Sequence, residues 1–429
     1  MIKVLYVLAG DMSFDEMLFL DSFINQLPAA GIENHILTPA LPVAHINLQN
    51  RHVDITQARP GFEYEEWREL IDSFDPQIVI LCDPYIMLGE DAPDLTYIEL
   101  AWLEDLPCVV AVMDFRANVL KTPDEQLALA SYILDGETPP YTLDYDFLIK
   151  ICPPHDAVQT QNPKLFQWGC QDQMGGLAIY NERDAVRKQL NCPPEAMLVT
   201  LVFPWEAALM AQERGLIDHF VVVVETLIYY LNQLSGEYLL SVVNMPPPFE
   251  DYEFENVHVR FFKTLDQHLL NGLFCATQLL ITESLTYPGL ALSASREIPS
   301  LVIGASVGLD AQGQLQHTLG ELSPFLQLKL DTLREENPDA LFPYISFPSR
   351  LRSAWPQTEL FQERFLYHLV DIFNEPRTVQ LIQELLHGGP AQDTFQQTLQ
   401  DYRQRKLDLT SDAEKIIRKL VTAPPRHLC

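Results

Sequence analysis

The chain has 429 residues, 47% of them hydrophobic and 10% aromatic, and a formal net charge of −31 at pH 7. This apolar content excludes a mainly disordered chain, and a length above about 300 residues favours two domains over a single core. The negative charge disfavours nucleic acids and membrane surfaces as partners, because both are bound through clustered Lys and Arg side chains.

The first part of the chain alternates between apolar runs and segments with helical spacing of apolar residues. The opening apolar run stops at Gly10, too early for a membrane-spanning helix and without a convincing cleavage site. Such strand, helix and strand units predict a parallel sheet. The predicted strands are 2–9, 32–37, 77–82, 108–113 and 147–152, and the predicted helices are 14–27 and 64–74.

The segment 155–178 is rich in Gln, Asn and Gly, has no clear period, and is interpreted as an interdomain linker. A second alternation follows it and again predicts a parallel sheet. Its predicted strands are 197–203, 238–243, 257–261, 278–281 and 300–304, and its predicted helices are 182–190, 217–234, 265–274 and 287–295. Four further helices are predicted after Pro348, at 359–373, 377–386, 394–406 and 411–421.

The cysteines and the missing motifs narrow the function. The seven cysteines form no Cys-x-x-Cys pair and lie mostly in apolar runs, which is typical of reduced core thiols and predicts a cytoplasmic protein. No GxxxxGK[ST] or HExxH motif occurs, so phosphate-loop ATPases and zinc proteases are disfavoured. The Gly10-Asp11-Met12-Ser13 turn does not continue as GxGxxG, which disfavours a dehydrogenase.

The turn after the predicted strand 278–281 carries most chemical information. It is rich in hydroxyl and carboxylate side chains: Thr282, Glu283, Ser284 and Thr286. A helix follows near Gly289, so backbone N–H groups and the positive helix end can hold a diphosphate without a metal. Every doubly wound fold needs ordinary strand-to-helix turns here, and this alternative stays open.

From 182 to 304 the order of features resembles the donor-binding half of the GT-B glycosyltransferases. That family typically has a short helix, a first strand, a later strand whose end holds the base, and then a strand, a small-residue turn, a helix and a Pro-led strand. This chain has 197–203, 257–262 and Pro299 in the matching places. It departs from the family in having Thr282-Glu283-Ser284 where a Gly-rich pair is common.

The resemblance implies an α/β protein with two Rossmann-like parallel-sheet domains facing a cleft and a helical C-terminal segment. The expected limits are 1–160 for an acceptor domain, 161–345 for a nucleotide and donor domain, and 346–429 for a helical tail that packs back on both. Glu283 would accept sugar or ribose hydroxyls, and Lys263 and Arg260 would offset phosphate charge. Ordinary surface ion pairs are the alternative for these two cations.

Candidate catalytic residues in the first half lie at strand ends. Asp11 follows the first predicted strand, where many GT-B enzymes keep their base, and it would deprotonate an acceptor hydroxyl if burial raises its pKa. Capping of the next helix is the alternative role. His155, near the interdomain crossing, is a second candidate base, with a solvated loop histidine as the alternative. Asp83 and Asp114 end other strands of this half.

These features predict a metal-independent glycosyltransferase that moves a sugar from a nucleotide-sugar donor to a small-molecule or peptide acceptor. The nucleotide-sugar is a co-substrate, and no cofactor, metal, nucleic acid or membrane is expected as a partner. A homodimer is compatible with the sequence. Two alternatives remain: a non-catalytic GT-B-like scaffold or activator, and a sugar-nucleotide epimerase.

Overall fold

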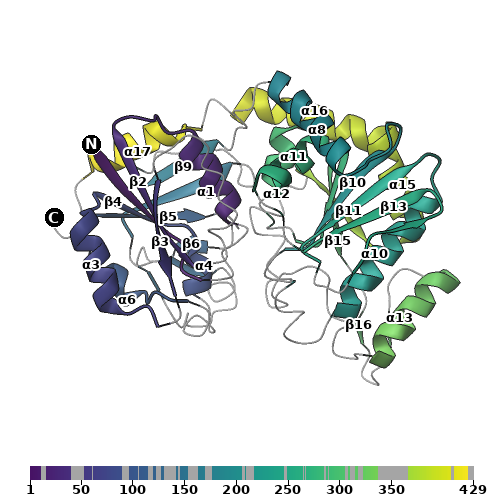
Figure 1. Cartoon of the computed structure of the whole chain (residues 1–429), viewed down its shortest axis with the longest axis horizontal. Coiled ribbons are helices and arrows are strands. Elements are labelled where there is room, and N and C mark those ends of the chain that lie inside the picture. The colour runs from purple at the N-terminus through teal and green to yellow at the C-terminus, as the bar shows by residue number, and fades with distance from the viewer. Residues whose placement is uncertain are drawn as a thin grey trace. The chain divides into compact units, whose positions relative to one another are not determined.

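The chain forms two compact units (Figure 1). Unit 1 consists of Met1–Gln173, Ser349–Glu363 and Tyr402–Cys429, and unit 2 of Met174–Pro348 and Arg364–Asp401, so the predicted tail 346–429 is divided between them. The structure is a computed structural model that describes residues 1–10, 16–39, 53–59, 61–88, 96–104, 106–114, 119–121, 127–129, 142–143, 145–152, 163–169, 176–204, 208, 217–245, 249–263, 265, 267–284, 287, 289–304, 308–309, 315–316, 322–336, 366–406 and 410–423.

Unit 1 is built on a parallel sheet of seven strands in the order β3-β2-β1-β4-β5-β8-β9. The strands are β1 (Ile2–Val7), β2 (Ile32–Pro39), β3 (Val53–Ala58), β4 (Ile78–Leu81), β5 (Val109–Asp114), β8 (Phe147–Cys152) and β9 (Leu165–Gly169). All of β4 and β5 is buried, as expected for β-branched strands covered on both faces. The strand order reverses between β1 and β4, which makes the sheet doubly wound.

Five helices and a small hairpin complete the described part of unit 1. They are α1 (Glu16–Asn25), α3 (Tyr64–Phe74), α4 (Pro84–Met87), α6 (Ala101–Glu104), α17 (Ala413–Val421) and the antiparallel pair β6 (Val119–Lys121) and β7 (Leu127–Leu129). Helix α3 begins in a capping box between Glu63 and Glu66 and buries Trp67, Leu70 and other apolar residues on one face.

The chain returns to unit 1 near its C-terminal end. Ser411 donates its N–H to Gln167 O at 2.8 Å and accepts from Gly169 N–H at 3.3 Å, so it extends the edge beside β9. The Gln26 side chain accepts from both Trp168 Nε1 and the Ala413 N–H, at 2.8 and 3.2 Å. Trp168 is fully buried beneath α1. These bonds hold α1, β9 and α17 together.

Unit 2 repeats the architecture with the order β12-β13-β11-β10-β14-β15-β18, in which only β12 runs antiparallel. The strands are β10 (Met197–Val202), β11 (Tyr238–Val243), β12 (Tyr252–Phe254), β13 (Val257–Phe262), β14 (Leu279–Thr282), β15 (Ser300–Gly304) and β18 (His368–Asp371), beside the short pair β16 (Gly308–Leu309) and β17 (Leu315–Gln316). The order reverses between β10 and β14.

Helices lie on both faces of this second sheet, and Figure 1 shows α11 and α12 on the opposite side from α10. They are α8 (Gly176–Gln189), α10 (Ile217–Asn232), α11 (Gln267–Ala276), α12 (Gly289–Ser295), α13 (Pro324–Glu336), α15 (Glu375–His387) and α16 (Pro390–Lys406). Helix α10 packs against α13 and α15. Its fully buried Tyr230 donates to Ile372 O at 2.5 Å.

The predicted fold class is confirmed: two α/β units with Rossmann-like parallel sheets. Two predictions about elements are wrong, one strand was missed and one helix begins earlier than predicted. The segment interpreted as a linker contains β9, whose Trp168 packs edge-on against Phe19 and Phe23. The helix predicted over 359–373 is wrong where β18 pairs with β15, because a short apolar stretch fits either state until a partner strand is present. Strand β3 was not predicted, and α8 begins at Gly176, ahead of the predicted 182.

Candidate functional site

The reversal of strand order in unit 2 defines its candidate site. Ligands of doubly wound sheets bind outside the carboxyl ends of the strands at such a reversal. Val202 of β10 pairs with Val243 and Thr282, and Val243 pairs with Phe262. The residues that follow therefore share one edge of the sheet: Lys263, Asn244, Phe203 and Glu283.

A partly buried histidine and a buried carboxylate meet at this edge. His219, in the first turn of α10, places Nε2 3.0 Å from Oε1 of Glu283, and the two side chains are 12% and 4% exposed. The imidazole also meets Phe220 edge-on, with ring centroids 5.3 Å apart. Because His219 lies in the first turn of α10, the positive end of this 16-residue helix lies beside the pair and favours a bound anion.

The hydroxyl-rich turn beside Glu283 is held by its own groups. Thr282 is fully buried, and its Oγ1 accepts a hydrogen bond from the Ser284 N–H at 3.3 Å. A Cβ on Gly289 would overlap the buried ring of Tyr287 and lie 2.9 Å from Phe274 Cζ. Close packing against these two rings therefore explains why position 289 is a glycine. Thr286 lies outside the described residues.

The two candidate cations of unit 2 lie farther away. Lys263 is exposed at the end of β13, three strand spacings from β14, which corresponds to about 14 Å. Arg260 turns toward the outer edge, with its Nε 3.7 Å from Asp251 Oδ2 and its Nη2 3.9 Å from Glu253 Oε1. The site thus brings together Thr282, Glu283 and Ser284 with His219, a residue that sequence reasoning missed. The sequence did offer a signal for His219, because it lies in the first turn of the helix predicted after the first strand of the unit.

Unit 1 has its own reversal, between β1 and β4. The Ala9 N–H donates to Asp83 Oδ2 at 2.7 Å, and the pairing of β4 with β5 puts Asp114 in the same row as Asp83. Both carboxylates are buried. Burial raises the pKa of the neighbouring Cys82 thiol, and the negative charge of Asp83 adds to that rise. The candidate bases Asp11 and His155 both lie outside the described residues.

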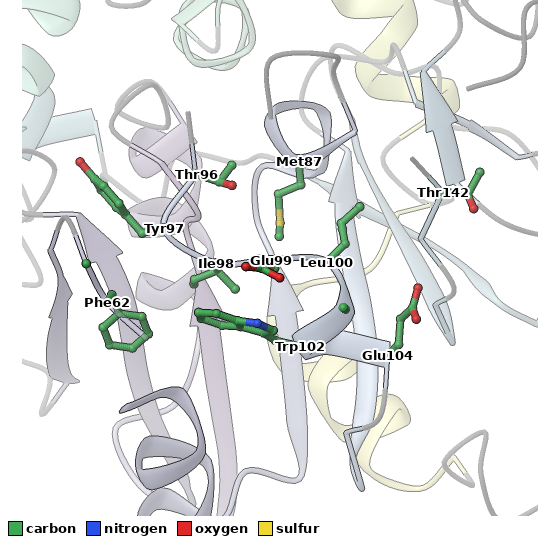
Figure 2. A pocket seen from close by; sticks show the side chains of 12 residues that line it. Phe62, Met87, Thr96, Tyr97, Ile98, Glu99, Leu100, Trp102, Glu104 and Thr142 are labelled. Atoms are coloured by element: carbon green, nitrogen blue, oxygen red, sulfur yellow. The ribbon is translucent and has the colours of Figure 1, made fainter. Parts of the chain in front are cut away.

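A pocket of about 490 Å³ opens in unit 1 close to this edge. Gly10, which precedes Asp11 in the sequence, forms a β-bridge with Thr96, and the Tyr97 N–H donates to Ala9 O at 2.8 Å. These bonds attach one wall of the pocket to the end of β1. Figure 2 shows the side chains that line it, including Phe62, Met87, Tyr97, Ile98, Glu99 and Trp102. This unit 1 pocket was not predicted from the sequence.

One sequence pattern is typical of a different class of enzyme. Gly304-Ala305-Ser306-Val307-Gly308 has the GxSxG form of the nucleophile turn in α/β-hydrolases. That turn leads into a helix, whereas Gly308, the last residue of this pattern, begins the short strand β16. A hydrolase is therefore not favoured.

Within the described part of the chain, no group of three or more His, Cys, Asp or Glu side chains could hold a metal ion. No helix in the described ranges is both long enough and apolar enough to cross a membrane.

Comparison with known proteins supports the fold. The model of the family described as "Family of unknown function (DUF6365)" matches residues 23–423. The structure titled "Spinosyn Forosaminyltransferase SpnP" is similar over 98% of this chain and 100% of that chain, with 12% identity and a TM-score of 0.57. The glycosyltransferase VinC, solved in complex with dTDP, is similar over 98% of this chain and 99% of that chain, with 10% identity and a TM-score of 0.51.

No curated protein matches the sequence. The identities to the solved structures are low, so the similarity concerns the fold alone. The predicted remote resemblance to GT-B glycosyltransferases is confirmed at that level.

Proposed function

This chain belongs to the family of unknown function DUF6365, and from its GT-B fold we propose that it transfers a sugar from a nucleotide-sugar donor to a small-molecule acceptor. The observation that carries the proposal is the close pair of His219 and Glu283, 3.0 Å apart, at the strand-order reversal of unit 2. A reversal in this fold class is where phosphorylated ligands bind, and both side chains suit a sugar diphosphate.

The donor would lie across the carboxyl edge of the unit 2 sheet. Its diphosphate would face the first turn of α10, where backbone N–H groups and the positive end of the helix would oppose the negative charge. Glu283 would accept hydrogen bonds from sugar or ribose hydroxyls, with Ser284 beside it. His219 has a role of its own in this arrangement: its Nε2 lies 3.0 Å from Oε1 of Glu283 and holds that carboxylate in place.

The proposed reaction is a displacement at the anomeric carbon. An acceptor hydroxyl oxygen forms the new bond to that carbon, while the bond from the carbon to the phosphate oxygen breaks. The nucleoside diphosphate leaves with that electron pair, and the hydroxyl proton passes to a carboxylate, for which we propose Asp11. His155 is the second candidate for this proton. Stabilising the negative charge on the leaving diphosphate contributes more to lowering the barrier than removing the acceptor proton does.

The test measures thermal unfolding of the full chain with UDP-, GDP-, dTDP- and CMP-sugars. One of them at a hundred times its Kd should stabilise the folded chain by about 2.7 kcal/mol and raise Tm by about 5 °C or more. His219→Gln should abolish most of that rise. The matched control is His258→Gln, because His258 forms a second histidine–carboxylate pair with Glu253 in the same unit, at 3.1 Å on the exposed sheet edge.

The control variant should keep the full rise in Tm. Absence of any rise, together with absence of donor turnover, would contradict the proposal. Asp11→Asn should keep donor binding and lose transfer, and unchanged transfer would remove Asp11 as the base.

A non-catalytic scaffold is the second candidate, and one observation favours it. At the turn where a donor would bind, the buried rings of Tyr287 and Phe274 both lie close against Gly289. A protein that had lost its donor would keep such packing and bind none of the four nucleotide-sugars.

A further inference from the structure

We infer that the unit 1 pocket binds an apolar, ring-containing molecule that carries a basic nitrogen, and that this is the chemical class of the acceptor. The assignment as acceptor rests on the proposed function, whereas the binding of such a molecule does not. The inference comes from the shape, lining and charge of the pocket and from its attachment to the end of β1.

The pocket has the size and lining of a small-molecule site. Its volume of about 490 Å³ lies within the range of about 300–1,000 Å³ found for such sites. Phe62, Tyr97 and Trp102 contribute aromatic surface, while the buried side chains of Met87 and Ile98 close its inner side. A molecule with one or two rings would bury apolar area against these walls.

The aromatic wall is held in place by contacts between its own rings and with helix α3. The Trp102 ring lies 5.8 Å from the ring of Tyr64, nearly perpendicular to it, and 6.4 Å from the ring of Phe62. Its backbone oxygen accepts a hydrogen bond from Trp67 Nε1 at 3.3 Å. Trp67 is fully buried in α3. A rigid aromatic wall of this kind loses little conformational entropy when a ring stacks on it.

The charged side chains that line the pocket have one sign. Glu99 and Glu104 are the charged side chains among its twelve lining residues, and both are exposed acids. Figure 2 shows the carboxylate of Glu99 above the Trp102 ring in that view, and the backbone N–H of Trp102 donates to the backbone oxygen of Glu99 at 3.0 Å. A carboxylate and the face of an indole both attract a cation, so together they favour an ammonium group over a neutral or anionic one.

The location of the pocket suits an acceptor. Its wall at Thr96 and Tyr97 is joined to Ala9 and Gly10 at the end of β1, the strand that Asp11 follows in the sequence. A protonated nitrogen is no nucleophile, because its electron pair holds the proton. Recognition would therefore fall to the nitrogen, and a hydroxyl elsewhere on the molecule would take the sugar.

The experiment uses three probes with one ring system and different charge: 1-naphthylmethylamine, 1-naphthalenemethanol and 1-naphthoate. Their Kd values for the full chain are measured by calorimetry at low ionic strength, without donor. The amine should bind about two- to fivefold more tightly than the alcohol, with the anion weakest. High salt should reduce the difference, because exposed charges are screened.

Three variants locate the effect. Glu99→Gln should weaken the amine about two- to fivefold and leave the alcohol unchanged. Trp102→Leu should weaken both amine and alcohol. Glu69→Gln removes an exposed carboxylate of the same unit outside the pocket and should change neither.

Equal binding of the three probes would overturn the inference, as would an unchanged amine Kd in Glu99→Gln with native unfolding behaviour. If Trp102→Leu unfolds, protection of the Tyr97 and Trp102 amides from hydrogen exchange by the amine decides the location, and its absence counts against the pocket. Amine binding without any response to nucleotide-sugars would refute the proposed function and leave this pocket assignment standing.

Discussion

Replacing Asp21 with Asn is expected to make unit 1 more stable at neutral and alkaline pH. Asp21 lies on α1 and is only 6% exposed. Burial raises the pKa of its carboxyl group from 3.8 to about 7, and a hydrogen bond with the Asn25 side chain offsets part of that rise. Among the described residues, its Oδ1 has no hydrogen-bond partner. The folded chain therefore holds this carboxyl group in its neutral form up to about pH 7.

The sign of the pH dependence follows from the two pKa values. Between about pH 4 and pH 7 the unfolded chain has lost this proton and the folded chain retains it, so the free energy of unfolding falls as the pH rises. The pKa values of the folded and unfolded chains differ by about three units, and each unit corresponds to about 1.4 kcal/mol. The free energy of unfolding therefore falls by an amount on the order of 4 kcal/mol across this range. Asn has no proton to lose, so the variant lacks this dependence.

The assay is urea unfolding of both proteins between about pH 4.5 and pH 8. Tryptophan fluorescence reports on this part of unit 1, because Trp168 packs against Phe19 and Phe23 of α1. The curves should converge at the acidic end and diverge above it, with Asp21→Asn the more stable. Asp72→Asn is the control, since the Asp72 side chain is 69% exposed on α3. Parallel curves for Asp21→Asn and the unaltered chain would refute the reasoning.

Three further changes test the packing of each unit. Ile417→Ala, on the fully buried face of α17, should cost about 2–5 kcal/mol of the free energy of unfolding of unit 1 by urea titration, and a loss below about 1 kcal/mol would show that α17 is not docked. Tyr230→Phe leaves Ile372 O without its buried donor and should cost about 1–3 kcal/mol in unit 2, whereas an unchanged urea midpoint would contradict that bond. Gly289→Ala should force the Tyr287 ring to move, at a cost of about 1–3 kcal/mol, and should weaken nucleotide-sugar binding in calorimetry; a neutral effect on both would contradict the packing at that turn.

The strands at the centre of each sheet could be predicted from the sequence. Segments such as 77–82 and 278–281 are short, continuous apolar runs that end at turn residues, and such runs are typical of strands buried on both faces. Their alternation with helical spacing was enough to predict two parallel sheets, and the order of features from 182 to 304 carried the resemblance to GT-B glycosyltransferases. The polar turn after 278–281 could also be named in advance, because strand ends in parallel sheets share one edge.

Only the tertiary structure decided which residues meet. His219 and Glu283 are 64 positions apart, and Phe62 and Trp102 are 40 apart, so no local pattern joins them. Strands β9 and β18 likewise depend on partner strands, because their composition also suits a loop or a helix. Burial by neighbours determines strand identity at a sheet edge, side-chain pairing at the candidate site and the raised pKa of Asp21, and that burial is a property of the folded chain.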